Sequence, residues 1–385
     1  MKRYRLGEIC EIVSGSTPKT SIQEYWDGDI KWITPAEITD DSYIITDTVR
    51  KITKLGVEKN GLSSFPAGTV ILSSRAPIGK VAIAGCDMYC NQGFKNLICS
   101  KIINNKYLYW FLKGKKDYLN KLGRGATFKE ISKQIVAEIE IELPSLEEQV
   151  LVANNLLNIK RVIDLKKKEI DLFDKLIKAR FVEMFGTVVD NRFGYEIKSL
   201  QDICEPIRDG THQTPTYTDD IIHGFKFLSS KDVTTRYVDW NHLKYIPKSL
   251  HDELYARIAP RKGDILLAKN GTTGVAAVVD RDEIFDIYVS LALLRPLNNI
   301  NSIYLWAAIN SNDVKKQFDS SLKGIGVPNL HLGEIKKAKI LVPHISEQMN
   351  FEKFVKQVDK SKVVVQQSLE KAQMLFDSLM QQYFG

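Results

Sequence analysis

Two long segments of the chain, residues 143–186 and 342–385, place apolar residues at alternating spacings of three and four. Such a seven-residue repeat is typical of helices that pack as a coiled coil. A helix of about 40 residues is about 60 Å long, which is too long for a small globular core. The pattern therefore predicts two helices that pack on each other through one seam: Leu156, Ile159, Ile163, Ile170, Phe173, Ile177 and Met184 in the first, and Val355, Val358, Val365, Leu369, Ala372, Phe376 and Leu379 in the second.

The two helical segments are copies of one another. They align without a gap at an offset of 199 residues, and six positions are identical. Nearly all the identities lie at the ends, where each segment opens with Pro-x-x-x-Glu-Gln and closes with Phe-Gly, which are signals for the start and end of a helix. Ser145 and Glu148 fit a capping box, whereas His344 replaces the serine in the second copy and should cap its helix less well.

Three cations interrupt the predicted seam, namely Lys166, Arg180 and Lys362. Their long side chains could extend to solvent at the edge of the seam. They could instead fix the register of the helix pair, as polar residues at such positions can. The sequence does not decide between the two interpretations.

The segments before the two helices repeat more loosely, in the same order. Residues 6–11 match 200–205, residues 30–38 match 225–233, and residues 68–79 match 263–274. The sequence thus predicts a globular domain at 1–142, a helix at 143–186, a second globular domain at 187–341 and a helix at 342–385. Each globular domain should be of mixed α/β (α+β) class. Strands are expected in the first domain near 31–34, 69–73, 81–84 and 139–143, and helices near 105–120 in the first domain and near 303–320 in the second.

Composition and charge narrow the class of protein and the kind of partner that it can bind. The chain has 385 residues, of which 44% are apolar and 26% charged, as in ordinary folded proteins. No stretch approaches the ~18 apolar residues of a membrane span, and no apolar signal-peptide segment follows the basic start, so we expect a cytoplasmic protein without membrane contact. Of the net charge of +7, the helices carry +1, so an anionic partner such as DNA should meet the globular domains.

No catalytic constellation stands out. The chain lacks a phosphate-binding loop, the F-x-G-x-G and N/D-P-P-Y/F motifs of amino-methyltransferases and any H-E-x-x-H pattern. Cys86, Cys90 and Cys99 have no histidine nearby, because the first in the chain is His212, so a zinc site is not expected and reduced thiols are. We expect no catalytic residue, metal or cofactor on this chain.

The globular domains do offer polar loops held by glycines, at matching places in both copies. Their Arg, Lys, Asn, Gln, Ser and Thr side chains are those that read base edges and phosphates, although any single loop could be ordinary turn chemistry. The candidate DNA-binding residues are Ser16, Thr17, Lys19, Lys31, Ser73, Ser74, Arg75, Asn91, Gln92, Lys95, Arg124 and Thr127 in the first domain, and Thr211, His212, Gln213, Lys226, Lys269, Asn270, Thr272, Thr273 and Lys323 in the second.

Together these patterns resemble the specificity subunit of a type I restriction–modification system, over nearly the whole chain. Residues 14–33, S-G-S-T-P…Y-W-D-G-D-I-K-W-I, look like the start of one target recognition domain, and residues 209–233 look like the start of a second. The helix openings L-P-S-L-E-E-Q and V-P-H-I-S-E-Q, with their F-G endings, are similar to the family's two central helices.

The resemblance implies a DNA-binding subunit whose two domains each read half of a bipartite, asymmetric target. Its helices would pack antiparallel, set the spacing between the half-sites and bind two modification (methyltransferase) subunits, with restriction subunits joining in the full complex. S-adenosylmethionine, ATP and Mg²⁺ would belong to those partners. Two other interpretations stay open, namely a protein-interaction scaffold that binds no DNA and a DNA-modifying enzyme with an unrecognised active site.

Overall fold

The structure is a computed structural model that describes residues 2–124, 129–322 and 329–385. The chain forms two compact units, one of residues 1–167 with 367–385 and the other of residues 168–366. Each unit contains one globular domain and one half of each long helix. Among the described residues, no helix is long and apolar enough to cross a membrane.

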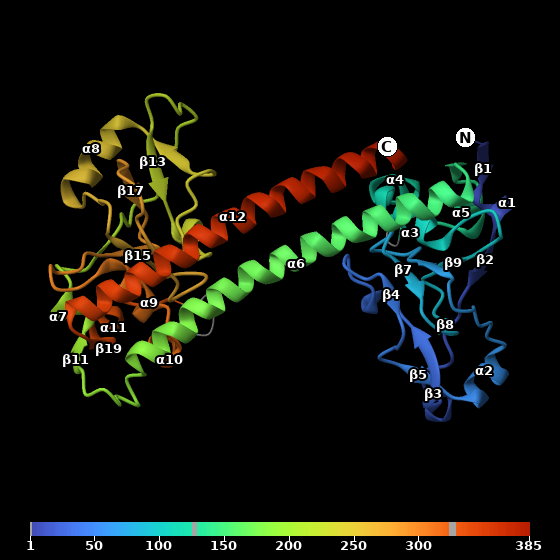
Figure 1. The fold of residues 1–385 in the computed structure, drawn as a ribbon, viewed down its shortest axis with the longest axis horizontal. Coiled ribbons are helices and arrows are strands. Elements are labelled where there is room, and N and C mark those ends of the chain that lie inside the picture. Colours follow the sequence, from blue (N-terminus) through green and yellow to red (C-terminus); the bar gives the residue numbers. More distant parts are fainter. Residues whose placement is uncertain (1, 125–128, 323–328) are drawn as a thin grey trace. The chain divides into compact units, whose positions relative to one another are not determined.

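Domain 1, the globular part of the first unit, is of mixed class (Figure 1). Its elements are β1 (Lys2–Arg5), α1 (Leu6–Ile9), β2 (Cys10–Ser14), η1 (Gln23–Tyr25), β3 (Trp26–Ile33), η2 (Pro35–Glu37), β4 (Ile44–Ile45), β5 (Lys51–Ile52), α2 (Lys54–Asn60), β6 (Val70–Leu72), β7 (Val81–Ala84), β8 (Tyr89–Cys90), β9 (Lys95–Cys99), α3 (Asn105–Gly114), α4 (Lys116–Leu122), α5 (Lys133–Ala137) and β10 (Glu140–Leu143). They form a five-stranded sheet in the order β2-β9-β6-β7-β4, a three-stranded sheet β5-β3-β8 and the pair β1-β10.

Domain 2, the globular part of the second unit, repeats this plan. Its elements are β11 (Glu196–Ser199), α7 (Leu200–Ile203), β12 (Arg208–Asp209), β13 (Phe225–Leu228), η3 (Ser230–Val233), β14 (Lys244–Ile246), α8 (Lys248–Arg257), β15 (Ile265–Ala268), β16 (Ala276–Val278), β17 (Phe285–Ile287), β18 (Leu291–Leu294), α9 (Ser302–Ile309), α10 (Asn312–Ser321), α11 (Leu332–Lys337) and β19 (Lys339–Val342). The sheets are β12-β18-β15-β16 and β14-β13-β17, with the pair β11-β19. They match those of domain 1 strand for strand, except that β4 has no counterpart among the described residues of domain 2. The predicted mixed class and internal duplication are confirmed.

The predicted helices near 105–120 and 303–320 are each two helices rather than one. In domain 1, α3 ends at Gly114 and α4 begins at Lys116, and in domain 2 a new helix follows Ser311. The Ser311 hydroxyl accepts a hydrogen bond from the Val314 amide, so it caps a new helix start. The apolar periodicity continues across this break, which is why the sequence pattern did not reveal it.

The long helices α6 (Leu146–Phe185) and α12 (Ile345–Phe384) have 40 residues each. Leu143, at the start of the predicted first segment, still belongs to β10, where it pairs with Lys2. Ser145 accepts a hydrogen bond from the Glu148 amide and so caps α6. In the second copy the reciprocal half of the box remains, because the His344 amide donates to Glu347.

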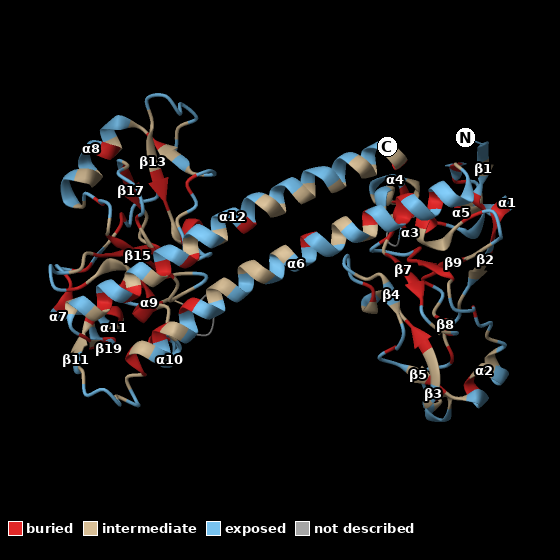
Figure 2. Cartoon of the chain, in the orientation of Figure 1, coloured by how far each residue is buried: buried red, intermediate tan, exposed pale blue. Residues whose placement is uncertain are grey.

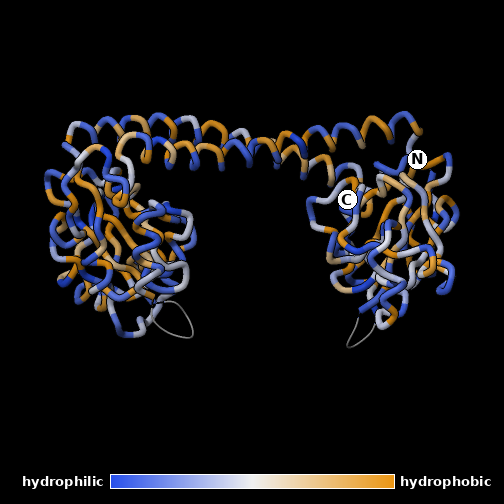
Figure 3. The backbone as a smooth tube through the Cα atoms, turned by 90° about the horizontal axis from the view of Figure 1, so that it is seen from below, coloured by the Kyte–Doolittle hydropathy of each residue, from blue (hydrophilic) through white to orange (hydrophobic). Residues whose placement is uncertain are grey.

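Each unit has its own core against which both helices pack. In the first, the beginning of α6 and the end of α12 lie on α3, where Trp110 contacts Phe376 and Tyr107 contacts Phe384. In the second, Phe185 at the end of α6 packs against Phe351 near the beginning of α12 and against Tyr304 of α9. The helices therefore run antiparallel in both units. Figure 2 shows the buried central strands and Figure 3 the mixed polarity along the helices.

None of the predicted seam residues is exposed: Leu156, Ile163, Ile177, Val355, Val358 and Val365 are buried, and Ile159, Ile170, Phe173, Met184, Leu369, Ala372, Phe376 and Leu379 are half-buried.

Two buried glutamines explain another of the repeated identities. Asn104 and Asn301 cap α3 and α9 through their side chains. The backbone amide of Asn104 donates to the side-chain oxygen of Gln149, and that of Asn301 donates to the side-chain oxygen of Gln348, each at 2.8 Å. Each glutamine also donates to two backbone carbonyls near its helix start. The same clamp therefore joins each long helix to the helix beneath it.

Candidate nucleic-acid interface

The polar loops of the two domains occupy equivalent positions in the sheets. The Ser74 amide donates to the Gly93 carbonyl in domain 1, and the Lys269 amide donates to the Ser290 carbonyl in domain 2. The next residue in each loop forms a β-bridge, Arg75 with Glu130 and Asn270 with Asn329. The register therefore places different side chains at matched positions, Ser74 with Lys269 and Arg75 with Asn270.

A close approach of two backbones builds the first loop of each domain. A Cβ atom at Gly15 would lie 2.0 Å from the Cys90 carbonyl oxygen, and one at Gly210 would lie 2.0 Å from that of Ile287. Only glycine fits at such a distance. These glycines hold the loops that carry Ser16 and Thr211 against the ends of β8 and β17.

In domain 1, Glu130 binds two of the predicted cations. Its carboxylate accepts from Arg75 Nε at 2.9 Å and from Lys95 Nζ at 3.2 Å, and Lys95 Nζ also lies 3.3 Å from the Ser74 hydroxyl. Burial alone would raise the pKa of Glu130, but the hydrogen bonds from Arg75 and Lys95 outweigh it and hold the pKa below its usual value. The carboxylate is therefore ionised at neutral pH.

The other predicted residues of domain 1 fall into an exposed and a buried group. Ser16, Lys19, Gln92 and Arg124 are exposed, and the Thr17 hydroxyl donates to the Gln92 side chain. A hollow beside Arg75 is lined by residues that include Lys80, Asn91 and Gly93. Ser73 and Ser74 are buried, and the Ser73 hydroxyl is hydrogen-bonded to Pro77 and Lys80 of its own loop.

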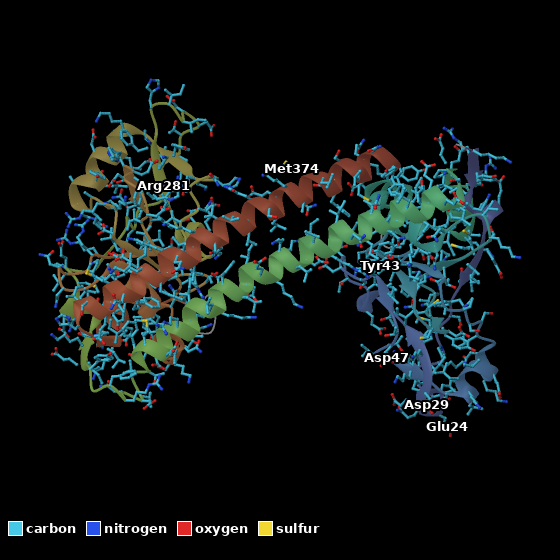
Figure 4. All side chains as sticks on the ribbon, in the orientation of Figure 1. Glu24, Asp29, Tyr43, Asp47, Arg281 and Met374 are labelled. Carbon is cyan, nitrogen blue, oxygen red and sulfur yellow. The ribbon has the colours of Figure 1, made fainter. Side chains whose placement is uncertain are left out.

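Lys31 lies away from this group, on β3. Its ammonium donates to the Thr46 carbonyl at 2.6 Å and to Cys86 Sγ at 3.3 Å. The carboxylates of Glu24, Asp29 and Asp47 lie along the same small sheet (Figure 4). Because its ammonium is already engaged by Thr46 and Cys86, Lys31 is the weakest of the domain 1 candidates.

In domain 2 the carboxylate comes from a different strand. Asp209 of β12 accepts from the buried Lys269 Nζ at 2.5 Å and lies 3.4 Å from His212 Nε2. Burial would raise the pKa of Asp209, but Lys269 and His212 outweigh it and lower the pKa. Arg257 of α8 donates to the carbonyls of Asp209 and Gly210 and so ties that helix to the loop.

The remaining candidates of domain 2 are mostly accessible. His212, Gln213 and Thr272 are exposed, and Asn270 and Thr273 are half-buried. Thr211 is buried, and its hydroxyl accepts from the Gln213 amide. Lys226, equivalent to Lys31, is half-buried and paired with Glu283. Thr127 and Lys323 lie outside the described residues.

Sequence reasoning missed the acidic members of both clusters. It selected cations, amides and hydroxyls, whereas Glu130 and Asp209 decide which of those cations are accessible. Arg257 was missed as well. Glu130 is 35 residues from Lys95, and no local pattern signals such a pairing. Asp209 lies directly before the loop glycine Gly210, and this position beside a candidate loop was the one feature of the sequence that could have indicated its role.

Domain 2 also contains a buried histidine–aspartate pair. His251 Nδ1 lies 2.7 Å from Asp286 Oδ2, and the other oxygen of Asp286 has no partner among the described residues. Burial raises the pKa of Asp286 to about 6, although the hydrogen bond to His251 opposes this. His251 stacks on Phe225, so the pair supports the small sheet β14-β13-β17.

Two of the three seam cations have defined partners. Lys362 donates to Asp174 of the other helix at 2.7 Å, so it forms an ion pair between the helices instead of extending freely to solvent. Arg180 pairs with Glu183 one turn along its own helix. Lys166 also has an interaction within the molecule.

All five cysteines are free thiols, and no group of three His, Cys, Asp or Glu residues in the described part of the chain could hold a metal ion.

The chain matches a known family over most of its length. Residues 1–172 and 194–372 match the family model described as type I restriction modification DNA specificity domain. The type I restriction enzyme MjaIX specificity subunit of Methanocaldococcus jannaschii is 38% identical over 219 residues, which cover 52% of this chain and 51% of that protein. The MjaVIII specificity subunit of the same organism is 22% identical over 375 residues, 92% of this chain and 85% of that protein. The match to MjaIX thus spans about half the length of that relative.

Two solved structures share the fold. The S subunit of a type I restriction–modification system from M. genitalium has a TM-score of 0.59 at 16% identity, covering 100% of this chain and 96% of that one. A chain from a structure of type I restriction–modification complex assembly has a TM-score of 0.62 at 17% identity, covering 100% and 97%. At these identities the likeness is one of fold.

Proposed function

The chain belongs to the type I restriction–modification DNA specificity family, and from this premise we propose that its two domains read the two halves of a bipartite, asymmetric DNA sequence. Recognition of DNA sequence is the function of the family. One observation carries the finer proposal: the two domains share sheet order and loop register yet place Arg75 and Asn270 at the same position. Similar readers with different side chains suit a target whose halves differ in sequence.

The accessible candidates form the proposed interface. They are Ser16, Thr17, Lys19, Arg75, Asn91, Gln92 and Arg124 in domain 1, and His212, Gln213, Asn270, Thr272 and Thr273 in domain 2. The buried Lys95 and Lys269 support the loops from beneath, and Ser73, Ser74 and Thr211 serve the same purpose. Because phosphate contacts release counterions, DNA affinity should fall steeply with salt concentration. Absence of salt-dependent DNA binding would favour the scaffold that binds no DNA.

The decisive experiment is a map of methylated bases. The full chain is expressed with modification subunits in a host that lacks other DNA methylation, and modified adenines are located by sequencing. A motif of two defined half-sites separated by unspecified bases supports the proposal. Exchange of residues 1–142 for those of a relative should change one half-site and leave the other intact. A single continuous motif, or a change in both halves, would contradict it.

We assign the spacing between the half-sites to the long helices. Half-sites on one face of a duplex recur about every 34 Å, so the distance between readers must be fixed. Deletion of about four residues, one helical turn, from α6 should change the tolerated spacer or prevent assembly. The preferred bases should stay the same. If the bases changed instead, the helices would not determine spacing.

The helices also offer a repeated surface for partner subunits. In the first unit Leu165 of α6 and Leu375 of α12 are exposed, and in the second their counterparts Val364 and Leu176 are exposed. Single exposed apolar residues are ordinary, and it is their recurrence at matched positions of both units that supports an interaction site here. We assign this surface to two copies of a modification subunit, one on each unit, with restriction subunits added in the full complex. Catalysis, S-adenosylmethionine, ATP and Mg²⁺ belong to those partners.

Native mass spectrometry of the co-purified complex tests this assignment. Leu165→Glu should leave one modification subunit bound instead of two, and Val364→Glu should do the same. The double variant should bind none. Val189→Glu, at an exposed apolar residue outside the helices, is the matched control and should keep both subunits. Retention of two subunits by the double variant would contradict the assignment.

A further inference from the structure

We propose that Arg75 reads a guanine in the half-site of domain 1, that Glu130 is the positioning residue that aims it, and that Asn270 reads an adenine at the equivalent position of domain 2. The inference rests on the proposed function. It adds an identity for one base in each half-site and a role for a carboxylate at a DNA-facing loop.

The contacts of Arg75 leave the reading atoms of its side chain available. Glu130 accepts the Nε hydrogen at 2.9 Å, and none of the described residues accepts a hydrogen bond from Nη1 or Nη2. The Arg75 side chain is 45% exposed. A guanidinium held through Nε presents its two terminal nitrogens as a fork, and such a fork matches the O6 and N7 acceptors of guanine.

Both the backbone and the carboxylate of Glu130 are held by neighbouring residues. Its amide and carbonyl both pair with Arg124 at 3.0 Å, and its backbone forms a second bridge with Arg75. The carboxylate oxygen that does not bind Arg75 accepts from the buried ammonium of Lys95. The carboxylate therefore keeps one orientation, and its hydrogen bond to Nε fixes the orientation of the Arg75 guanidinium. A reader held in its binding geometry loses little conformational freedom when it binds.

The surface beside Arg75 has room for the edge of a base. The hollow there is lined by Thr34, Pro35, Lys80 and Asn91 as well as by Arg75. The Asn91 side-chain oxygen accepts from the Gly93 amide, so its amino group is directed elsewhere and can donate. The hollow thus combines donors, which suits the acceptor-rich major-groove edge of guanine.

Domain 2 replaces both members of the Arg75–Glu130 pair by amides. Asn270 stands at the position of Arg75, and Asn329 stands at that of Glu130. In the part of domain 2 that the structure describes, no residue hydrogen-bonds the Asn270 side chain. An asparagine amide pairs bidentately with N6 and N7 of adenine. The same scaffold position therefore reads different bases in the two domains.

Selection from a random double-stranded DNA library with the full chain tests the inference. We expect the wild type to recover two half-sites, with guanine preferred roughly 5- to 150-fold at one position of the first. R75A should abolish that preference and change no other position. R75K, which keeps the charge but loses the fork, should abolish it too. N270A should remove one adenine preference from the other half-site.

The role of Glu130 has its own variants. E130Q should lower the guanine preference to a value between those of the wild type and R75A. K95M should lower the unfolding temperature and lower the preference less than E130Q does, because Arg75 keeps its bond to Glu130. E130Q/K95M removes the unpaired buried charge that E130Q leaves behind. If E130Q/K95M keeps full guanine preference, Glu130 does not position Arg75.

Two further results would overturn the assignment. An equal loss of affinity for all sequences in R75A, restored in R75K, would make Arg75 a phosphate contact. A wild-type motif without guanine in one half-site and adenine in the other would contradict the base assignment while leaving bipartite recognition intact. The proposed function fails separately, if the wild-type chain recovers no bipartite motif at all, and this inference would fail with it.

Discussion

The two domains place a buried lysine–carboxylate pair at the same end of the central sheet but build it from different positions. In domain 1 the lysine is Lys95 at the start of β9, and its partner is Glu130. In domain 2 the position of Lys95 is held by Ala292, the lysine is Lys269 and its partner is Asp209. The lysine side chains are 9% and 8% exposed, so both pairs lie beneath the loops.

This difference shows how one scaffold can present different readers. In domain 1 the carboxylate also holds Arg75 and so directs a cation outward. In domain 2 the carboxylate faces Lys269 and His212 from within the sheet, and the loop above it carries a neutral asparagine. The buried charge supports the loop in both domains, while the choice of strand that supplies it decides which side chain remains accessible.

The largest expected effect concerns these two carboxylates. Asp209→Ala should lower the free energy of unfolding by about 3–5 kcal/mol, because it leaves Lys269 buried without a partner. Glu130→Ala should cost less, because Glu130 is 34% exposed against 13% for Asp209 and Lys95 keeps the Ser74 hydroxyl. Urea denaturation measures the change in the free energy of unfolding. Hydrogen exchange in β6 and β15 shows which of the two domains has become less stable.

The matched control for this comparison is Asp219→Ala, at an exposed carboxylate of domain 2, which should change little. If Glu130→Ala lowered the free energy of unfolding more than Asp209→Ala, burial would not determine how much each lysine–carboxylate pair contributes to stability.

The second effect should be equal in the two units. Gln149→Ala and Gln348→Ala should each lower the free energy of unfolding by about 1–3 kcal/mol, because each leaves buried backbone groups without hydrogen bonds. Gln357→Ala, at an exposed position of α12, is the control. Urea midpoints of the three variants make the comparison. A loss confined to one of the two buried glutamines would break the equivalence of the clamps.

A smaller effect should appear only in domain 2 and depend on pH. The pKa of Asp286 is raised to about 6, so between about pH 4 and pH 6 the folded protein holds a proton that the unfolded chain has lost. The contribution of Asp286 to stability therefore falls as pH rises through this interval. Burial raises the pKa of Asp286 and the hydrogen bond from His251 opposes this, and the value of about 6 is the net of the two.

Urea midpoints of the wild type and of Asp286→Asn from pH 4 to pH 7 test this. The difference between them should change over the interval, and a constant difference would contradict it. Tyr89 occupies the equivalent register position in β8, so hydrogen exchange in domain 1 should show no matching pH dependence.

The smallest effect concerns the seam. Lys362 corresponds to the buried Ile163 of the other helix at the repeat offset, and it pairs with Asp174. Lys362→Ile imports the residue of the first unit and should change the free energy of unfolding by at most about 1 kcal/mol, because the pair is partly exposed. Urea denaturation measures it. A much larger loss would show that Lys362 determines helix register rather than adding a peripheral ion pair.

Local periodicity is what the sequence revealed without the structure. The spacing of apolar residues on the long helices, their Pro and Phe-Gly ends and the repeated order of short motifs all depend on residues near one another in the chain. They predicted the duplicated mixed fold, the family and the matched positions of Arg75 and Asn270. The same reasoning joined two helices into one near 105–120 and again near 303–320, because the apolar pattern does not show where one helix ends and the next begins.

Only the tertiary structure decided which polar residues are free to meet a ligand. Arg75, Lys95, Lys226 and Lys269 are all cations paired with a carboxylate, yet the Arg75 side chain is 45% exposed whereas Lys95 and Lys269 are buried and Lys226 is half-buried. Ser74, another candidate, is buried as well. Such pairing depends on which strands become neighbours in the sheet, and strand order is set by the packing of the whole domain. The repeat can therefore be recognised from local spacing in the sequence. The set of accessible candidate residues cannot, because it depends on which lysines and carboxylates, distant in the sequence, pair with each other in the folded domain.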